Sequence, residues 1–229
     1  MDKLELREKE PHETVREYAY RVLYQNIMTL KLPPGTAMSE QELSGILKVS
    51  RTPVREAFIR LAQSGLLEVL PQRGTFVSNI HTEQLAEFRF FRVTLERGIM
   101  ELACQEFLDP WKTKLEFCIF EQGKFIEASD AESFFKSDNT LHSLLYEGCG
   151  MPHIWRIVQN SNLDYVRARV LNVSDTDEQM KILYEQHKGI VSAVFDKNVK
   201  AAQDIMTEHI NKVMGDVAVL KKEYPEYFG

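Results

Sequence analysis

Four side chains in the second half of the sequence have the chemistry of metal ligands. Asp138 and His142 are four residues apart, so both would project from one face of a helix. His187 and His209 lie in two later segments whose apolar residues also recur with helical spacing. Three imidazoles and one carboxylate on three helices can form a divalent transition-metal site inside a helical bundle. The alternative that spacing leaves open is that each histidine caps its own helix or faces solvent.

A second group of polar side chains opens the segment 50–61, whose apolar residues predict a short amphipathic helix. Arg51 and Arg55 share a helical face that points away from the apolar stripe. Ser50 is a suitable N-cap residue, and Thr52 adds a second hydroxyl near the helix start. Hydroxyls, guanidinium groups and a helix N-terminus together suit phosphates and guanine edges. We therefore interpret this segment as the recognition helix of a DNA-binding domain.

Two predicted helices precede this segment and would position it. Residues 12–30 carry apolar side chains at helical intervals, and residues 31–36, with two prolines and a glycine, predict a turn. Ser39 and Glu42 form a capping-box pattern at the start of a second helix. Helix, turn and recognition helix in this order indicate a helix-turn-helix motif.

Two short strands are predicted after the recognition helix, at residues 66–70 and 75–78. The turn between them contains Arg73 and Gly74. A hairpin of two strands cannot bury itself alone, so it is expected to pack on the helices as a wing. Gly74 would allow the wing backbone to approach a phosphate or the minor groove closely.

The remainder of the chain shows helical spacing almost throughout, and we expect no strand in it. Breaks in the pattern divide it into roughly six helices, an all-α bundle. The expected organisation is a polar lead-in at residues 1–11, a winged helix-turn-helix domain at 12–79 and an all-helical domain at 80–229. The expected fold class is therefore mainly α.

The composition limits the class of protein. Hydrophobic residues make up 44% of the 229 residues, enough for a packed core. We find no apolar run of about 18 residues that would span a membrane. Residues 1–80 hold 11 Lys and Arg against 10 Asp and Glu, whereas residues 81–229 hold 17 against 24, so the net charge of -6 comes from the second domain. The three widely spaced cysteines are expected to be reduced core residues of a cytoplasmic protein.

Several residues of the first domain stand at fixed spacings: Pro34-Gly35, Glu42-Leu43, Val49-Ser50-Arg51-Thr52-Pro53-Val54-Arg55-Glu56-Ala57, Leu61, Gly65-Leu66 and Gly74-Thr75-Phe76-Val77. Together they resemble the winged-helix signature of GntR-family bacterial transcription regulators. The resemblance implies double-stranded operator DNA as the partner, contacted by Ser50, Arg51, Thr52, Arg55, Arg73 and Gly74. Members of the FadR-like subgroup often carry arginine where this chain has Gln41, which can still reach an adenine edge or a phosphate.

The four candidate metal ligands belong to longer patterns: Asp138-x-x-x-His142, His187-x-x-Ile190-x-x-Ala193 and Ala201-x-x-x-x-Met206-x-x-His209. These patterns are similar to the metal-binding pattern of the FCD effector domain in the FadR-like subgroup. The resemblance implies that Asp138, His142, His187 and His209 bind an ion such as Zn²⁺, Ni²⁺ or Mn²⁺. One or two coordination positions would be left for water or for the carboxylate of an effector.

Arg92 and Glu96, in Arg92-Val93-Thr94-Leu95-Glu96, resemble the R-x-x-L-E motif of the first helix in that domain. The arginine of that motif often faces the ligand cavity, so the resemblance implies that Arg92 binds an effector carboxylate. An ion pair with Glu96, four residues on, is the alternative. Arg167 and Arg169 are weaker candidates for the effector cavity, and surface exposure is the alternative for at least one of them.

The leading hypothesis is a homodimeric bacterial transcription regulator, expected to be a repressor. A small organic acid bound at or near the metal would change the spacing of two recognition helices, and so the affinity for the operator. A metal sensor with the ion as its effector is one alternative. A metalloenzyme fused to a DNA-binding module is another, but the sequence has no P-loop, nucleophile elbow, HExxH motif or clear general base. We therefore expect that the chain is not an enzyme.

Overall fold

The computed structural model describes residues 4–161, 163–172 and 176–229. The chain divides into two compact units, and each draws on more than one stretch of sequence. The N-terminal unit comprises Met1–Thr82, Val166–Leu171 and Val219–Gly229, and the C-terminal unit comprises Glu83–Tyr165 and Asn172–Ala218. Two late segments of the chain therefore belong to the unit that contains the N-terminal elements.

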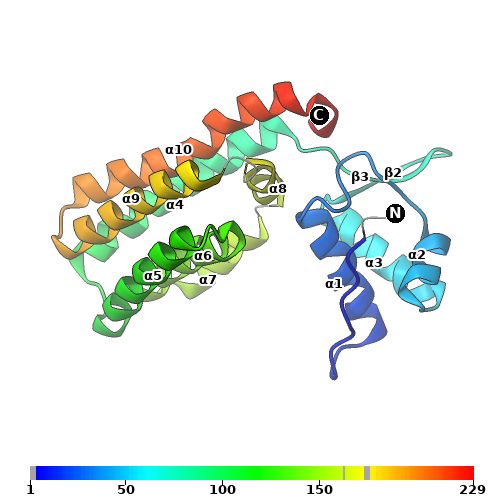
Figure 1. The fold of residues 1–229 in the computed structure, drawn as a ribbon, viewed down its shortest axis with the longest axis horizontal. Coiled ribbons are helices and arrows are strands. Elements are labelled where there is room, and N and C mark those ends of the chain that lie inside the picture. Colours follow the sequence, from blue (N-terminus) through cyan, green and yellow to red (C-terminus); the bar gives the residue numbers. More distant parts are fainter. Residues whose placement is uncertain (1–3, 162, 173–175) are drawn as a thin grey trace. The chain divides into compact units, whose positions relative to one another are not determined.

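Three helices and a small antiparallel sheet form the part of the N-terminal unit that comes first in the chain (Figure 1). In chain order they are α1 (Val15–Met28), β1 (Ala37–Met38), α2 (Glu40–Leu47), α3 (Arg51–Gln63), β2 (Leu67–Leu70) and β3 (Gly74–Val77). The strand order is β1-β3-β2, and β2 pairs with β3 in the register that places Leu67 opposite Val77. The predicted winged helix-turn-helix fold is confirmed. Strand β1 is an addition to the predicted hairpin, because two residues are too few to show the alternation of a strand.

Local capping chemistry sets the starts of these three helices. Thr14 and Glu17 form a capping box at α1, and Oγ of Ser39 accepts a hydrogen bond from the backbone N–H of Glu42 at α2. Ser50 occupies the predicted N-cap position of α3, but its side chain makes no capping hydrogen bond. The first turn of α3 therefore keeps backbone N–H groups that can donate to a phosphate.

Seven helices of the described residues follow the wing. They are α4 (Thr82–Gln105), α5 (Asp109–Glu127), α6 (Ala131–Gly148), α7 (Pro152–Asn160), α8 (Leu163–Asn172), α9 (Thr176–Phe195) and α10 (Val199–Glu223), before a 3₁₀ turn, η2, at Pro225–Tyr227. The predicted all-helical architecture is confirmed, with one helix more than expected. The difference arises because the segment that starts at Pro152 is divided into α7 and α8, and no glycine or proline marks that division.

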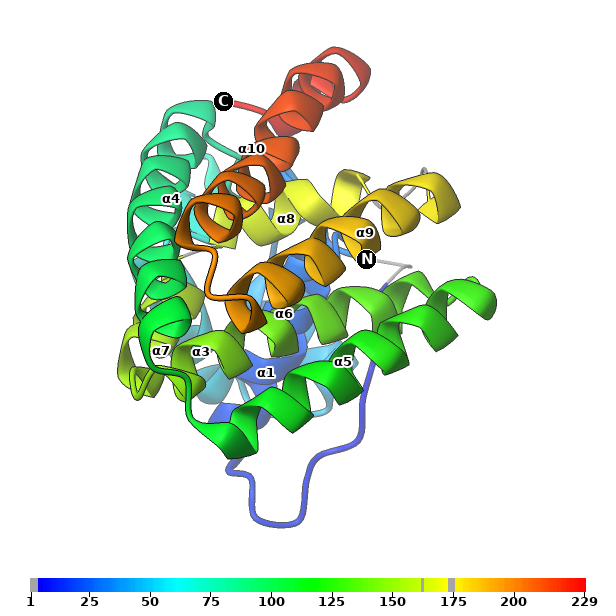
Figure 2. The same cartoon turned by 90° about the vertical axis from the view of Figure 1, so that its left-hand side faces the viewer.

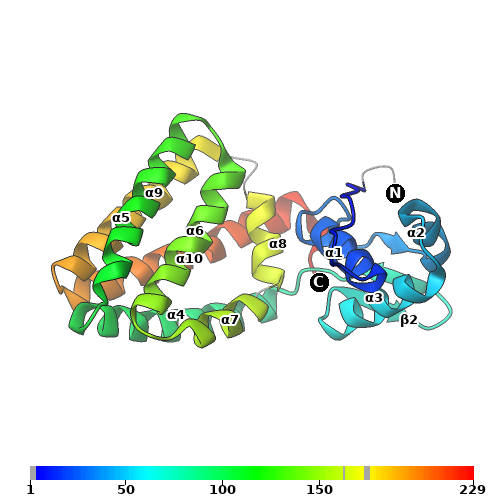
Figure 3. The ribbon, with the colours of Figure 1, turned by 90° about the horizontal axis from the view of Figure 1, so that it is seen from below.

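Several helices of the C-terminal unit run side by side. Helices α5, α6 and α9 contact one another and lie side by side in Figures 2 and 3. Helix α4 runs along α10 (Figure 1), where Arg97 donates hydrogen bonds to the side chains of Gln203 and Thr207. No described helix is both long and apolar enough to cross a membrane. All three cysteines are free thiols, as predicted.

Candidate metal centre and DNA-binding surface

Helices α6, α9 and α10 carry the four predicted metal ligands on their buried faces. On α6, Asp138 and His142 follow the buried Phe134 at four-residue intervals. On α9 and α10, His187 and His209 likewise fall among buried apolar residues. The amphipathic spacing that turns apolar side chains into the core therefore also turns these polar groups inward.

Three of the four predicted ligands come together. Oδ1 of Asp138 lies 3.2 Å from Nε2 of His187 and 3.7 Å from Nε2 of His209. One candidate ligand atom from each residue lies within 4.8 Å of the other two. All three residues are buried, and His209, the most accessible, is only 5% exposed. One ion could therefore contact all three side chains.

Two glutamines hold the outer nitrogens of these histidines. Nδ1 of His187 lies 2.8 Å from Oε1 of Gln122, a fully buried side chain of α5. Nδ1 of His209 lies 3.3 Å from Oε1 of Gln186 on α9. Because an amide oxygen only accepts hydrogen bonds, each Nδ1 is the donor, and in a neutral ring Nε2 then keeps its lone pair. Outer partners of this kind orient histidines that bind metals.

His142 lies beside this cluster and also faces a second group of charges. Its Nε2 is 3.3 Å from Nε2 of His209 and 3.1 Å from Nη2 of Arg92. Its Nδ1 is 3.1 Å from Oε1 of Glu96. The ring stacks on Trp155, with centroids 5.7 Å apart. His142 is therefore shared between the three clustered ligands and the neighbouring pair of Arg92 and Glu96.

Arg92 and Glu96 form an ion pair in the core of the C-terminal unit. Nη2 of Arg92 lies 2.7 Å from Oε1 of Glu96, and the two side chains are 2% and 0% exposed. The guanidinium also lies over the ring of Tyr165, 5.3 Å from its centroid. This is the pairing that the sequence offers as the alternative to a ligand-facing arginine. It leaves further N–H donors on Arg92, because a guanidinium has five.

Burial and neighbouring charges shift the pKa of two groups in the site. Burial, with a further contribution from His187, holds the pKa of His209 well below its ordinary value. His209 is therefore a neutral imidazole at neutral pH, the form that binds metals. Burial opposes ionisation of Glu96, but the neighbouring His142 and Arg92 outweigh it and hold the pKa of Glu96 below its usual value. The site thus holds a neutral imidazole, His209, near an ionised carboxylate, Glu96.

The donor set fits a divalent transition metal. The two Nε2 lone pairs and the carboxylate of Asp138 are all acceptors, and they converge in a buried region. Acceptors in such proximity repel one another unless a proton or a cation lies among them. Imidazole nitrogens with one carboxylate suit ions such as Zn²⁺ and Ni²⁺. Asp138, His187 and His209 could therefore hold the ion, and His142 is placed to join them.

The other two arginines considered for an effector cavity lie on α8. Arg167 is fully buried, and it donates hydrogen bonds to the backbone carbonyl groups of Ser78 and Asn79 rather than facing a ligand site. Arg169 is half-buried and belongs, like Arg167, to the N-terminal unit, whereas Arg92 belongs to the C-terminal unit. The structure therefore does not gather the predicted effector-binding residues in one unit.

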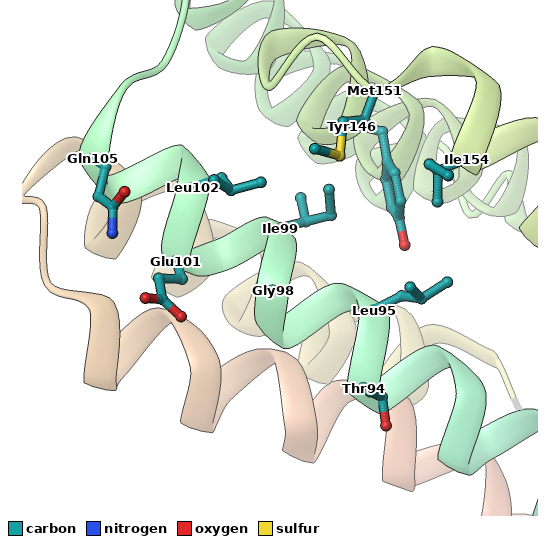
Figure 4. Close-up of a pocket in the computed structure, with 10 residues that line it drawn as sticks. All are labelled: Thr94, Leu95, Gly98, Ile99, Glu101, Leu102, Gln105, Tyr146, Met151 and Ile154. Atoms are coloured by element: carbon teal, nitrogen blue, oxygen red, sulfur yellow. The ribbon is translucent and has the colours of Figure 1, made fainter.

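A cavity of about 390 Å³ opens between α4, α6 and α7 (Figure 4). Its walls are mostly apolar and include Leu95, Leu102, Met151 and Ile154. The ring of Tyr146 extends from α6 toward α4 in this view. None of the four predicted metal ligands lines the cavity, so it is separate from the candidate metal centre.

All seven residues predicted to contact DNA are exposed: Gln41, Ser50, Arg51, Thr52, Arg55, Arg73 and Gly74. Nη2 of Arg51 lies 3.8 Å from Oε2 of Glu40, a surface pair too weak to keep the guanidinium from a phosphate. Gly74 has a φ of 111°, a conformation that favours glycine, and it begins β3 at the tip of the wing. The side chains with DNA-binding chemistry are therefore accessible on α2, α3 and the wing.

The two glutamines behind the histidines are not among the site residues that the sequence pattern predicts. Gln122 carried a signal, because it lies four residues after Cys118 on the buried stripe of α5, where a polar side chain needs a partner. Gln186 is only half-buried, so its position gave no comparable signal.

Two family descriptions match successive parts of this chain. Residues 15–77 match the bacterial regulatory proteins of the gntR family, and residues 87–212 match the FCD domain. The HTH-type transcriptional repressor RspR of Escherichia coli K12 is 31% identical over 218 residues, which cover 95% of each chain. An HTH-type transcriptional regulator in an unstable DNA locus of Streptomyces ambofaciens is 35% identical over 216 residues, covering 94% of this chain and 90% of that one.

A solved structure supports the fold. E. coli McbR/YncC superimposes with a TM-score of 0.72 at 19% identity, over 93% of this chain and 99% of that one. The matched families and the relatives are transcription regulators, so the metalloenzyme alternative is set aside. The chain belongs to the GntR family of bacterial transcription regulators and carries an FCD domain in its C-terminal part.

Proposed function

We propose that this regulator is a homodimeric repressor whose affinity for operator DNA is controlled by a small carboxylate bound near a divalent metal. Residues 12–79 would bind the DNA, and residues 80–229 would bind the metal and the effector and form the dimer. The observation that supports the metal most directly is the convergence of Asp138, His187 and His209, with both outer histidine nitrogens held by glutamines.

The metal ligands proposed are Asp138, His187 and His209, with His142 as the fourth. The ion would be Zn²⁺, Ni²⁺ or Mn²⁺, and when bound it would supply positive charge for an effector carboxylate. Arg92, whose guanidinium lies 3.1 Å from His142, is the proposed partner of that carboxylate. Arg169 is a second proposed contact of the effector.

The proposed binding of operator DNA is supported by the exposed polar and charged groups of α2, α3 and the wing. Arg51 and Arg55 would reach base edges or phosphates from α3, and Arg73 would reach from the wing. Two such units in a homodimer would read two half-sites. The name of the relative RspR describes that protein as a repressor, which supports the same sign of regulation here.

Two measurements test the metal and the effector separately. Calorimetric titration of metal-stripped protein with Zn²⁺, Ni²⁺ and Mn²⁺ should show one site per chain, and Asp138→Ala should abolish it. The matched control is Asp109→Ala, which removes an exposed carboxylate paired with the surface Lys112. Wild-type titrations without any binding event would contradict the metal site.

The effector is tested on a duplex that the protein itself enriches from a random-sequence library. Fluorescence anisotropy should show that one of a panel of small mono- and dicarboxylates lowers the affinity of the metal-loaded protein for that duplex. If no carboxylate changes the affinity but EDTA alone does, the protein is a metal sensor with the ion as its effector. If neither changes it, effector control is contradicted.

A further inference from the structure

The segment that leaves the wing is held in place by a buried arginine from α8. Nη1 of Arg167 donates a 2.7 Å hydrogen bond to the carbonyl oxygen of Ser78, and Nη2 donates a 3.1 Å bond to that of Asn79. Nη2 also lies 3.4 Å from Oγ of Ser78. Arg167 is 0% exposed, and all these residues belong to the N-terminal unit. One planar guanidinium therefore binds two successive backbone carbonyl groups directly after β3.

The same segment is tied to two other parts of the N-terminal unit. The N–H of Ser78 donates to the carbonyl oxygen of Leu66 at 3.0 Å, which fixes the start of the segment to the base of the wing. The N–H of Ile80 donates to the carbonyl oxygen of Tyr227 at 2.8 Å, and the N–H of Gly229 donates back to Ile80 at 3.0 Å. Residues 78–80 are therefore a fixed segment, although they connect the wing to α4.

Helix α8 also carries a residue of the other unit. Tyr165, two positions before Arg167, belongs to the C-terminal unit and is only 3% exposed. Its ring packs edge-on against Phe88, with centroids 5.5 Å apart, and lies under the guanidinium of Arg92. Arg92 is the arginine that contacts His142. A single helix thus carries both a residue packed against Arg92 and the arginine that holds the end of the wing.

We propose that Arg167 is a positioning residue for DNA binding: it fixes the backbone at residues 78–80 and so sets the wing for the operator. We further infer that α8 transmits changes at Tyr165 to Arg167, a part that rests on the proposed metal site. Lysine could not replace Arg167 fully, because a single ammonium lacks the planar fork that matches two neighbouring carbonyl groups.

Hydrogen exchange measured on the full chain tests the first part without any metal. In Arg167→Gln, the amides of Ser78 and Ile80 should exchange about tenfold faster than in the wild type, while those of α1 and α3 keep their protection. Affinity for the duplex selected by the wild type should fall about tenfold. Arg167→Lys should recover part of both losses and is the second variant if Arg167→Gln does not fold.

The control for lost charge is Arg16→Gln, which removes an exposed arginine of α1 in the same unit. It should leave exchange at residues 78–80 unchanged. Unchanged exchange and duplex affinity in both Arg167 variants would overturn the proposal. An equal rise in exchange throughout α1, α3 and the wing would also overturn it, because Arg167 would then act only on overall stability.

The transmission part is tested with Ni²⁺ as the probe. Saturating Ni²⁺ should alter exchange at residues 78–80 in the wild type but not in Arg167→Gln or Tyr165→Leu. The Kd for Ni²⁺ in Arg167→Gln should stay within about twofold of the wild-type value. A Ni²⁺ response that persists in both variants would overturn the role of α8. Absence of Ni²⁺ binding to the wild type would instead contradict the metal site and, with it, the transmission through α8. The hydrogen-exchange experiment without metal would still decide whether Arg167 positions the wing.

Discussion

Nδ1 of His187 and Oε1 of Gln122 lie 2.8 Å apart, and neither side chain has any exposed surface. The contact joins α9 to α5, and in the neutral ring it determines that Nδ1 of His187 carries the proton. Because Nε2 then keeps its lone pair toward Asp138, the position of one glutamine on α5 decides whether His187 can act as a ligand.

Replacing Gln122 by methionine should therefore weaken metal binding without removing a ligand. Met keeps a similar volume, but its sulfur is only a weak acceptor for the Nδ1–H group. We therefore expect the affinity for Ni²⁺ or Zn²⁺ to fall about 10- to 100-fold. Calorimetric titration of the metal-stripped protein measures this loss. Gln159→Met, at an exposed position of α7, is the control and should bind like the wild type. An unchanged Kd in folded Gln122→Met would show that the outer contact has no role in binding.

Gly148 and Gly98 should respond in opposite directions to the same substitution. A Cβ at Gly148 would collide with the ring of Phe107. A Cβ at Gly98, in the interior of α4, meets no atom of the described residues within 4 Å, apart from its chain neighbours and its own helical backbone. We expect Gly148→Ala to lower the free energy of unfolding by about 1–3 kcal/mol, through overpacking. Gly98→Ala should raise it by about 0.5–1 kcal/mol, because alanine is the better helix former. Urea denaturation compares the two variants, and equal shifts in both would contradict the packing at Phe107.

Arg55→Ala should weaken DNA binding, because the guanidinium is exposed on the face of α3 that carries Arg51. The loss expected for one base contact is about 1–3 kcal/mol of binding free energy on the selected duplex. If Arg55 contacts a phosphate instead, the affinity should fall equally for all duplexes. The slope of the logarithm of the binding constant against the logarithm of salt concentration should then become shallower by about one unit. Fluorescence anisotropy at several salt concentrations distinguishes a base contact from a phosphate contact. The control is Arg7→Ala in the polar lead-in, and equal affinities for Arg55→Ala and the wild type would contradict the recognition-helix assignment.

Cys149 should be a poorly reactive thiol until strongly alkaline pH. Burial, with a smaller contribution from Cys104, raises its pKa from 9.0 to about 11. Below pH 9 the thiolate fraction, and hence the alkylation rate, should be about 100-fold lower than in the unfolded chain. Because the unfolded state releases this proton first, the contribution of Cys149 to stability is present at neutral pH and falls as pH rises above about 9.

Iodoacetamide labelling of Cys149 in a variant that carries Cys104→Ser and Cys118→Ser, followed by mass spectrometry from pH 7 to 10, measures this reactivity. The same variant in concentrated urea supplies the reference rate. Native labelling as fast as in urea at pH 8.5 would contradict the burial of the Cys149 thiol.

The sequence by itself determined the elements and the faces on which the functional groups lie. The apolar period of residues 50–61 and the turn residues around Gly74 predict α3 and the wing, and the four-residue spacing of Asp138 and His142 predicts one face of α6. These signals are local, because helical period, caps and turns depend on residues only a few positions apart. The residue spacings that resemble the GntR and FCD patterns indicate the same elements and the same faces.

Only the tertiary structure decided which groups meet. Gln122 and His187 are 65 positions apart in the chain, and Arg167 and Ser78 are 89 apart, so no local pattern links either pair. Their contacts depend on how α5 packs against α9 and on the inclusion of part of α8 in the N-terminal unit. A buried polar group must find a partner, but the packing of distant segments determines which partner it finds.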